Sequence, residues 1–174
     1  MTIINPTPSI AIRPLERRDE ERCARLMSTS EPWTTLGRDF EASLAVVRDP
    51  AAVVYVAEDD GRFAGFIVLS LAGVLNGYIR SIAVEPANRG RGVGTQLMAF
   101  AEARIFAGSP NAFLCVTSFN DRARALYERL GYEYVGELRD FFVRGVSELL
   151  YRKTRGSWTD FRRETTINPV GTTQ

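Results

Sequence analysis

The chain has 174 residues, of which 45% are hydrophobic, so it is long enough to bury a core and too apolar to be disordered as a whole. Its 22 basic and 21 acidic residues leave a net charge of +1, which argues against a dedicated nucleic-acid binder. Histidine is absent, which excludes the usual Ser-His-Asp and Cys-His catalytic units and a His-ligated zinc site.

The first third of the sequence predicts one short strand and two helices. Residues 1–8 contain two prolines and are expected to form an irregular leader, whereas residues 9–14 alternate as a strand does. Asp19 is expected to cap the helix that follows it. A loop at residues 31–37 separates this helix from a second one, whose apolar residues recur at helical spacing and which stops near residue 49.

Three strands and a helix are predicted in the middle of the chain. Residues 53–58 and 63–71 have the pattern of a hairpin, because an Asp-Asp-Gly turn lies between two apolar runs. Residues 78–84 predict a further strand that enters a glycine-rich loop. The helix after this loop is predicted over residues 94–106, with Leu97, Ala101 and Ile105 on its inner face.

The last third predicts a strand, a helix and a terminal hairpin. Residues 112–117 are nearly all apolar, as in a central strand buried on both faces. Asn120 can cap a helix over residues 121–130, and two strands follow at residues 132–138 and 147–153. The order β-α-α-β-β-β-α-β-α-β-β predicts an α+β fold with a mixed sheet and helices on its faces.

The glycine-rich loop is the most informative segment, with the sequence Arg89-Gly90-Arg91-Gly92-Val93-Gly94-Thr95. Its spacing matches neither the G-x-G-x-x-G dinucleotide fingerprint nor the G-x-x-x-x-G-K-[ST] phosphate loop. Bare backbone N–H groups at a helix start, beside guanidinium groups, suit a pyrophosphate. We therefore expect a phosphate-bearing ligand to bind here, although a glycine-rich turn with solvated arginines is the alternative.

A second motif lies on the next strand–helix unit. The segment from Asn120 to Tyr132 has the spacing N-x-x-A-x-x-x-Y-x-x-x-G-[FY], with Tyr127 at the tyrosine position. Together with Arg89-x-x-Gly92-x-Gly94 and the strand order, this resembles the GNAT superfamily of N-acetyltransferases. The resemblance covers residues 9–153 as one domain, with residues 1–8 and 156–174 as terminal extensions.

The resemblance implies a three-layer α/β/α fold with a mixed, mostly antiparallel sheet of about seven strands. It implies acetyl-CoA as co-substrate, no metal, and an acyltransferase that moves an acetyl group directly to a primary amine of a small molecule or protein. Tyr127 would be the catalytic acid that assists the departing thiolate. The implied acetyl-CoA-binding residues are Ile82, Ala83, Val84, Arg89, Gly90, Arg91, Gly92, Val93, Gly94, Thr95 and Asn120.

The sequence does not identify the base that must take a proton from the amine. Some relatives carry a glutamate on the fifth strand, but residues 113–119 contain no acid. The resemblance places the loop of Glu31 and Trp33 beside the acceptor, and Tyr78 could line the same side. Capping and packing are the alternative roles for these three residues. The acids are scattered, which disfavours a polyamine or antibiotic acceptor.

Two other functions remain open from the sequence alone. One is a non-catalytic module of the same fold that binds or senses acyl-CoA, and the other is a nucleotide-binding protein of a different family. Cys23 and Cys115 have no metal or redox spacing and are expected to be reduced and buried, which makes Cys115 a poor nucleophile. We expect a cytoplasmic protein without nucleic-acid or membrane partners, able to form a homodimer.

Overall fold

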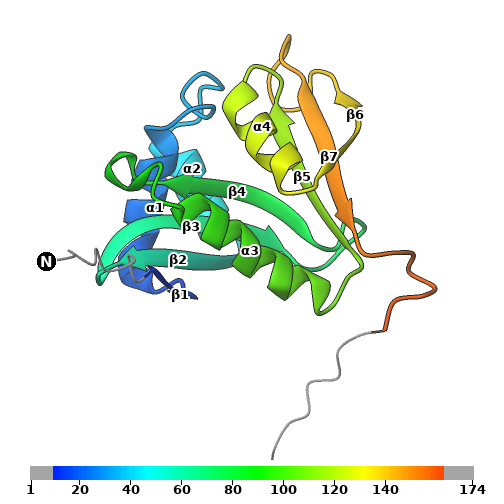
Figure 1. Cartoon of the computed structure of the whole chain (residues 1–174). Helices are drawn as coiled ribbons and strands as arrows, with labels where there is room; N and C mark the ends of the chain where they lie inside the picture. The colour runs from blue at the N-terminus through cyan, green and yellow to red at the C-terminus, as the bar shows by residue number, and fades with distance from the viewer. Residues whose placement is uncertain (1–9, 163–174) are drawn as a thin grey trace, which may run out of the picture.

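The computed structural model describes residues 10–162, which form a seven-stranded sheet in the order β1-β2-β3-β4-β5-β7-β6 (Figure 1). The predicted leader, Ser9 and residues 163–174 of the predicted C-terminal extension lie outside the described residues. The strands are β1 (Ile10–Pro14), β2 (Val53–Asp59), β3 (Arg62–Ser70), β4 (Tyr78–Val84), β5 (Asn111–Thr117), β6 (Glu133–Leu138) and β7 (Glu148–Thr154). The helices are α1 (Glu20–Ser28), α2 (Phe40–Val47), α3 (Val93–Phe106) and α4 (Asp121–Arg129). This chain order confirms the predicted one.

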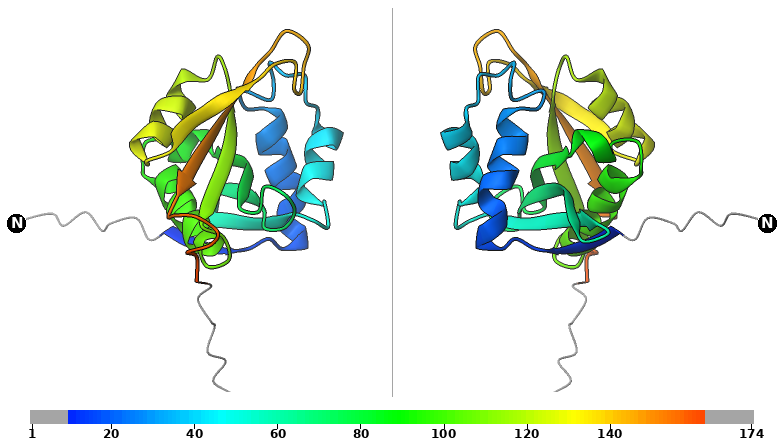
Figure 2. Two further views of the ribbon diagram at one scale, coloured as in Figure 1. Left: turned by 90° about the vertical axis from the view of Figure 1, so that its right-hand side faces the viewer. Right: turned by 90° about the vertical axis from the view of Figure 1, so that its left-hand side faces the viewer.

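Helices cover both faces of the sheet, which confirms the predicted three layers. Helices α1 and α2 lie on one face, and α3 and α4 lie on the other (Figure 2). The α3 side buries Leu97, Ala101 and Ile105, as their spacing predicts. The α1 side buries a second cluster that includes Cys23 and Met27. The hydrophobic effect on both faces therefore fixes the sheet between two helical layers.

The sheet opens between β4 and β5, its single parallel pair. The two strands pair at only two positions, Tyr78 with Phe113 and Ile79 with Leu114, and then diverge. Gly77 precedes the paired end with φ 94°, and a Cβ there would overlap the Asn111 carbonyl oxygen. Only glycine allows this close approach. The backbone on the open side of both strands is left without a ladder partner.

The terminal hairpin inserts β7, not β6, beside β5. Antiparallel pairing joins Thr117 to Glu148 and Cys115 to Leu150. The expectation that β5 is buried on both faces is only partly right, because Phe113 and Cys115 are half-buried. Phe113 pairs with Tyr78 of β4, whereas Cys115 lies beyond the two paired positions, in the open part of the sheet.

Asp19 occupies the N-cap position of α1, but its carboxylate does not cap that helix. It accepts hydrogen bonds from Arg13 at 2.6 and 3.0 Å and from the Glu16 amide at 3.0 Å. Arg13 also donates to Glu58 on β2. The predicted cap is therefore replaced by an ionic network that ties the start of α1 to the sheet.

None of the helices within residues 10–162 is long and apolar enough to cross a membrane. The cytoplasmic location and the homodimer stay predictions.

Candidate active site

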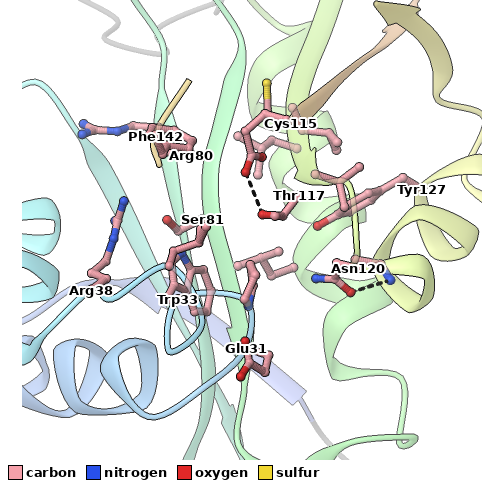
Figure 3. Close-up of a pocket in the computed structure, with 18 of the residues that line it drawn as sticks. Glu31, Trp33, Arg38, Arg80, Ser81, Cys115, Thr117, Asn120, Tyr127 and Phe142 are labelled. Atoms are coloured by element: carbon pink, nitrogen blue, oxygen red, sulfur yellow. Dashed lines mark hydrogen bonds between the residues drawn. The ribbon is translucent and has the colours of Figure 1, made fainter. Parts of the chain in front are cut away.

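The gap between β4 and β5 contains a cavity of about 130 Å³. Its walls come from the α1–α2 loop, β4, β5, α4 and the segment around the start of β7, and Figure 3 shows the side chains that surround it. Part of the predicted acetyl-CoA site and the three predicted acceptor residues therefore meet in the opening of the sheet, whereas Ala83, Val84 and residues 89–95 do not line it. Six of them line the cavity: Glu31, Trp33, Tyr78, Ile82, Asn120 and Tyr127.

Tyr127 directs its hydroxyl from α4 into this cavity (Figure 3). The side chain is 7% exposed, and its ring packs edge-on against Tyr132 with the centroids 6.1 Å apart. Burial raises the pKa of Tyr127 to about 12. The phenol is therefore protonated at neutral pH and available as a hydrogen-bond donor.

Asn120 lies between β5 and α4, and the oxygen and the nitrogen of its side-chain amide have different roles. Its Oδ1 accepts the Ala123 amide at 3.2 Å, which confirms the predicted helix cap. The side-chain nitrogen points away from that bond, toward the cavity (Figure 3). The cap thus orients a free amide donor at the place where the resemblance implies a ligand.

The glycine-rich loop leaves the open end of β4 and enters α3. Gly90 and Gly92 have φ values of 76° and 85°, in the left-handed region that favours glycine. Gly92 is the N-cap of α3, so the amides of the first helical turn have no carbonyl partner within the helix. A helix start of this kind suits a phosphate group. The loop residues lie outside the lining of the cavity.

Polar side chains anchor this loop to neighbouring strands. The buried Asp59 carboxylate accepts Asn88 Nδ2 at 3.0 Å and forms an ion pair with Arg91 at 3.1 Å. Arg89 folds back, and its Nε donates to the Val84 carbonyl oxygen at 3.2 Å. These contacts hold the backbone amides of the loop in place while leaving them accessible.

Glu148, at the start of β7, is a carboxylate of this cavity that sequence reasoning missed. Its side chain is almost fully buried, and Oε1 accepts a 2.7 Å hydrogen bond from the Thr117 hydroxyl, drawn as a dashed line at Thr117 in Figure 3. Burial raises the pKa of Glu148, whereas the Thr117 bond and the charge of Arg38 lower it. The net rise makes Glu148 a better proton acceptor than an exposed glutamate.

Arg38 and Arg80 line the cavity on the side opposite Tyr127 (Figure 3). Arg80, on β4, forms a 2.5 Å ion pair with Asp49. Arg38, in the α1–α2 loop, is half-buried, and its Nη1 contacts the Met27 sulfur at 3.7 Å. Burial and the nearby Arg80 charge lower the pKa of Arg38. The lowered pKa indicates a cation that would gain from an anionic partner.

The three predicted acceptor residues differ in how they contribute to the cavity. Glu31 lies at the exposed rim, where its carboxylate accepts the Thr35 amide at 3.3 Å, and hydrogen bonds from Thr34 and Thr35 lower its pKa. A lowered pKa makes Glu31 a weak base and favours its capping role. Trp33 is half-buried against the α1 core, and burial raises the pKa of Tyr78.

Cys115 is half-buried and lines the cavity, which corrects the expectation of a buried thiol. Burial raises the pKa of Cys115, so little thiolate forms at neutral pH. Its expected weakness as a nucleophile therefore has a physical basis, although the reason is not complete burial. Cys23 is buried, as predicted.

Comparison with known proteins places this geometry in a family. The family model described as the acetyltransferase (GNAT) family matches residues 13–132. The chain belongs to the GNAT acetyltransferase family. This membership confirms the resemblance and excludes a nucleotide-binding protein of a different family.

Two relatives and one solved structure illustrate the range of similar proteins. The N-alpha-acetyltransferase RimI of Mycobacterium tuberculosis is 30% identical over 158 residues, covering 86% of this chain and 96% of RimI. An uncharacterised protein of Mycobacterium leprae is 34% identical over 131 residues, covering 73% of this chain, which spans about a third (35%) of that relative. An aminoglycoside 6′-N-acetyltransferase in complex with coenzyme A has the same fold, with 18% identity, a TM-score of 0.66 and coverage of 83% and 96%.

Sequence signals for the missed GNAT site residues are weak. An acid opens the last predicted strand at position 148, but only the insertion of β7 beside β5 brings it to the cavity. Arg38 lies in a loop that contains no recognisable motif. Thr117 is the last residue of an apolar strand, and nothing in the neighbouring sequence marks it as a site residue. These residues become site candidates only once the sheet order is known.

Proposed function

We propose that this chain transfers an acetyl group from acetyl-CoA directly to a primary amine. The observation that carries the proposal is the pairing of Tyr127 and Glu148 in one cavity, located where the sheet opens. One group is a protonated phenol and the other a carboxylate with a raised pKa. The cavity thus holds a proton donor and a proton acceptor, as acyl transfer to an amine requires.

Acetyl-CoA would bind along the open edge of β4 and across the start of α3. The Ile82 backbone and the Val84 amide, which have no ladder partner on the β5 side, offer hydrogen bonds to the amide-containing arm, and Asn120 offers its side-chain nitrogen. The Val84 carbonyl oxygen already accepts Arg89 Nε. Ala83 does not reach the open edge, because its main chain pairs with Phe66 of β3 and its side chain is buried on the α1 side. The first-turn amides of α3 suit the pyrophosphate. Apart from Ala83, these are the cofactor residues expected from the sequence.

The chemistry follows from the two ionisable groups. Glu148 takes a proton from the amine, directly or through a water, so that the nitrogen lone pair attacks the thioester carbonyl carbon. A carbon–nitrogen bond forms, the carbon–sulfur bond breaks, the electron pair leaves with the CoA sulfur, and the surplus proton on the new amide nitrogen passes to that sulfur or to water. Tyr127 donates a hydrogen bond to the departing thiolate. Stabilising this charge is its main contribution, because a phenol with a pKa of about 12 is a weaker acid than a thiol.

A module that only binds or senses acyl-CoA is the second candidate. Nothing in binding alone calls for a buried carboxylate with a raised pKa beside a buried phenol, since burying a charge without use is costly. The presence of both groups in one cavity supports catalysis over sensing.

The test is release of CoA thiol from acetyl-CoA by the purified chain with a panel of primary amines. We expect release with at least one amine and a fall of about 100-fold in kcat for Tyr127→Phe, with unchanged affinity for CoA. Tyr134→Phe, on the exposed side of β6, is the matched control and should keep full activity. Tight CoA binding without release for any amine would overturn the proposal in favour of the sensor.

A further inference from the structure

A second cavity of about 540 Å³ adjoins the proposed active site. The two cavities share six lining residues, which are Arg38, Tyr78, Arg80, Ser81, Cys115 and Phe142. The second one extends away from Tyr127 and Asn120, toward Leu75 and Leu138. Its volume is in the range of small-molecule sites. Because Glu148 and Tyr127 line only the first cavity, the second is free for the body of the amine acceptor.

The charged residues of the second cavity are all of one sign. Arg38 and Arg80 line it, and no carboxylate does. Arg80 is already paired with Asp49, whereas no carboxylate of residues 10–162 forms an ion pair with Arg38. A half-buried guanidinium without an anionic partner is poorly compensated, and a carboxylate is its best bidentate ligand.

Most of the remaining wall of the second cavity is apolar. Phe141 and Phe142, in the turn before β7, have rings in edge-to-face contact with centroids 4.6 Å apart, and both are more than half exposed. Leu75, Leu138 and Leu150 complete this wall. Exposed aromatic rings beside a concave apolar surface favour an apolar group on the ligand.

We propose that the acceptor is a small amine that carries a carboxylate and an apolar group, as a hydrophobic amino acid does, with Arg38 binding the carboxylate. This proposal rests on the proposed acetyl transfer. Glu148 and Arg38 both line the first cavity, and Arg38 also lines the second, so a carboxylate and a guanidinium border the same space. An amino acid matches this arrangement, with its amine toward Glu148 and its carboxylate toward Arg38.

The same charges act against polycationic acceptors. An aminoglycoside or a polyamine would place ammonium groups beside Arg38, whose charge no carboxylate lining the second cavity offsets. The acceptor of this chain should therefore differ from that of the aminoglycoside acetyltransferase with the same fold.

The test compares acceptors that differ only in the carboxylate. Acetyl transfer is measured with phenylalanine and leucine, with phenylalaninamide and leucinamide, and with spermidine. We expect kcat/KM to be at least about 10-fold higher for the acids than for their amides, which corresponds to one good charged contact. Arg38→Met should remove this preference mainly through KM, Arg38→Lys should restore part of it, and Arg62→Met, outside both cavities, should leave it unchanged.

A binding readout keeps the test independent of turnover and of folding. N-acetylphenylalanine should raise the melting temperature of the CoA-saturated wild type more than N-acetylphenylalaninamide does, and this difference should vanish in Arg38→Met. Transfer to the amides or spermidine but not to the acids would overturn the acceptor proposal while the proposed function stands. Transfer to no amine at all would instead overturn the proposed function.

Discussion

The Thr117 hydroxyl donates a 2.7 Å hydrogen bond to Glu148 Oε1 across the paired strands β5 and β7. This bond fixes the orientation of the carboxylate in the proposed active site. It also stabilises the charged form of a group that burial would otherwise protonate. Two strands that are distant in the chain thus supply one oriented acid–base group.

Replacing Glu148 by glutamine should lower turnover without weakening the binding of acetyl-CoA. The amide keeps the size and the contact with Thr117 but cannot accept a proton, so kcat should fall about 100-fold or more. Initial rates of CoA thiol release and a CoA titration measure the two quantities. Glu133→Gln, on exposed β6, is the control. Loss of CoA binding with normal turnover at saturation would contradict the assigned role.

Removing the Thr117 hydroxyl should shift the pH dependence of the reaction. Glu148 must be ionised to act, so the rate falls as pH falls through its pKa, which burial raises above the ordinary 4.5. Thr117→Val removes a bond that lowers this pKa, so the fall should begin at higher pH. The nearby Arg38 charge, which also lowers it, remains, while Tyr78 and Cys115 beside it stay neutral.

The measurement is kcat against pH with one acceptor for wild type, Thr117→Val and Glu148→Gln. If the fall of kcat at low pH came from protonation of the amine substrate, it would occur at the same pH in all three proteins. If kcat of Thr117→Val falls at the same pH as kcat of the wild type, Glu148 is not the titrating group.

Two glycines of the loop should respond in opposite ways to alanine. Gly92 has φ 85°, so Gly92→Ala should reduce the free energy of unfolding by about 1–2 kcal/mol. Gly94 has helical backbone, and an added Cβ would make an ordinary 3.6 Å contact with Val84, so Gly94→Ala should cost nothing and can add up to about 1 kcal/mol. Urea unfolding distinguishes them. Equal losses would mean that the left-handed turn is not required.

Breaking the network around Asp19 should destabilise the protein in a pH-dependent way. Asp19→Asn leaves Arg13 with a weaker partner and should lower the free energy of unfolding by about 1–3 kcal/mol at pH 7. The Arg13 hydrogen bond lowers the pKa of Asp19 below 3.8 in the folded state. The contribution of Asp19 to stability is therefore present above pH 3.8 and is lost as the pH falls through the lowered pKa of the folded state.

Urea unfolding at pH 7 and in strong acid measures this difference. Arg18→Gln, which removes only the exposed pair with Glu16, should change stability by less than about 0.5 kcal/mol. A cost of Asp19→Asn that is the same at both pH values would contradict the ionic explanation.

The local structure of the proposed acetyl-CoA side could be predicted from the sequence because its parts are consecutive in the chain. The glycine loop follows β4 directly, and Asn120 and Tyr127 occupy one turn and helix after β5. Local rules of capping, glycine conformation and periodicity are sufficient there. The same rules predicted the bounds of most strands within one or two residues.

The acceptor side could not be predicted in the same way. Arg38 and Glu148 lie far apart in the chain and meet only because β7 pairs with β5 and the α1–α2 loop folds over the opening. Local pattern carries no information about which strand of a hairpin joins the sheet. Asp19 shows the same limit, because Arg13 of β1, which also pairs with Glu58 of β2, draws the Asp19 carboxylate away from the local cap.

The limited pairing of β4 and β5 has a consequence for how the protein resists local opening. Strands β1–β4 and β5–β7 are joined within the sheet at only two residue pairs, so the two parts can separate at the open end at little cost in backbone hydrogen bonds. Amides along that edge should therefore exchange with deuterium faster than those of β3, which is paired on both sides. A ligand bound to both parts at once would slow this exchange and act as a temporary strand between them.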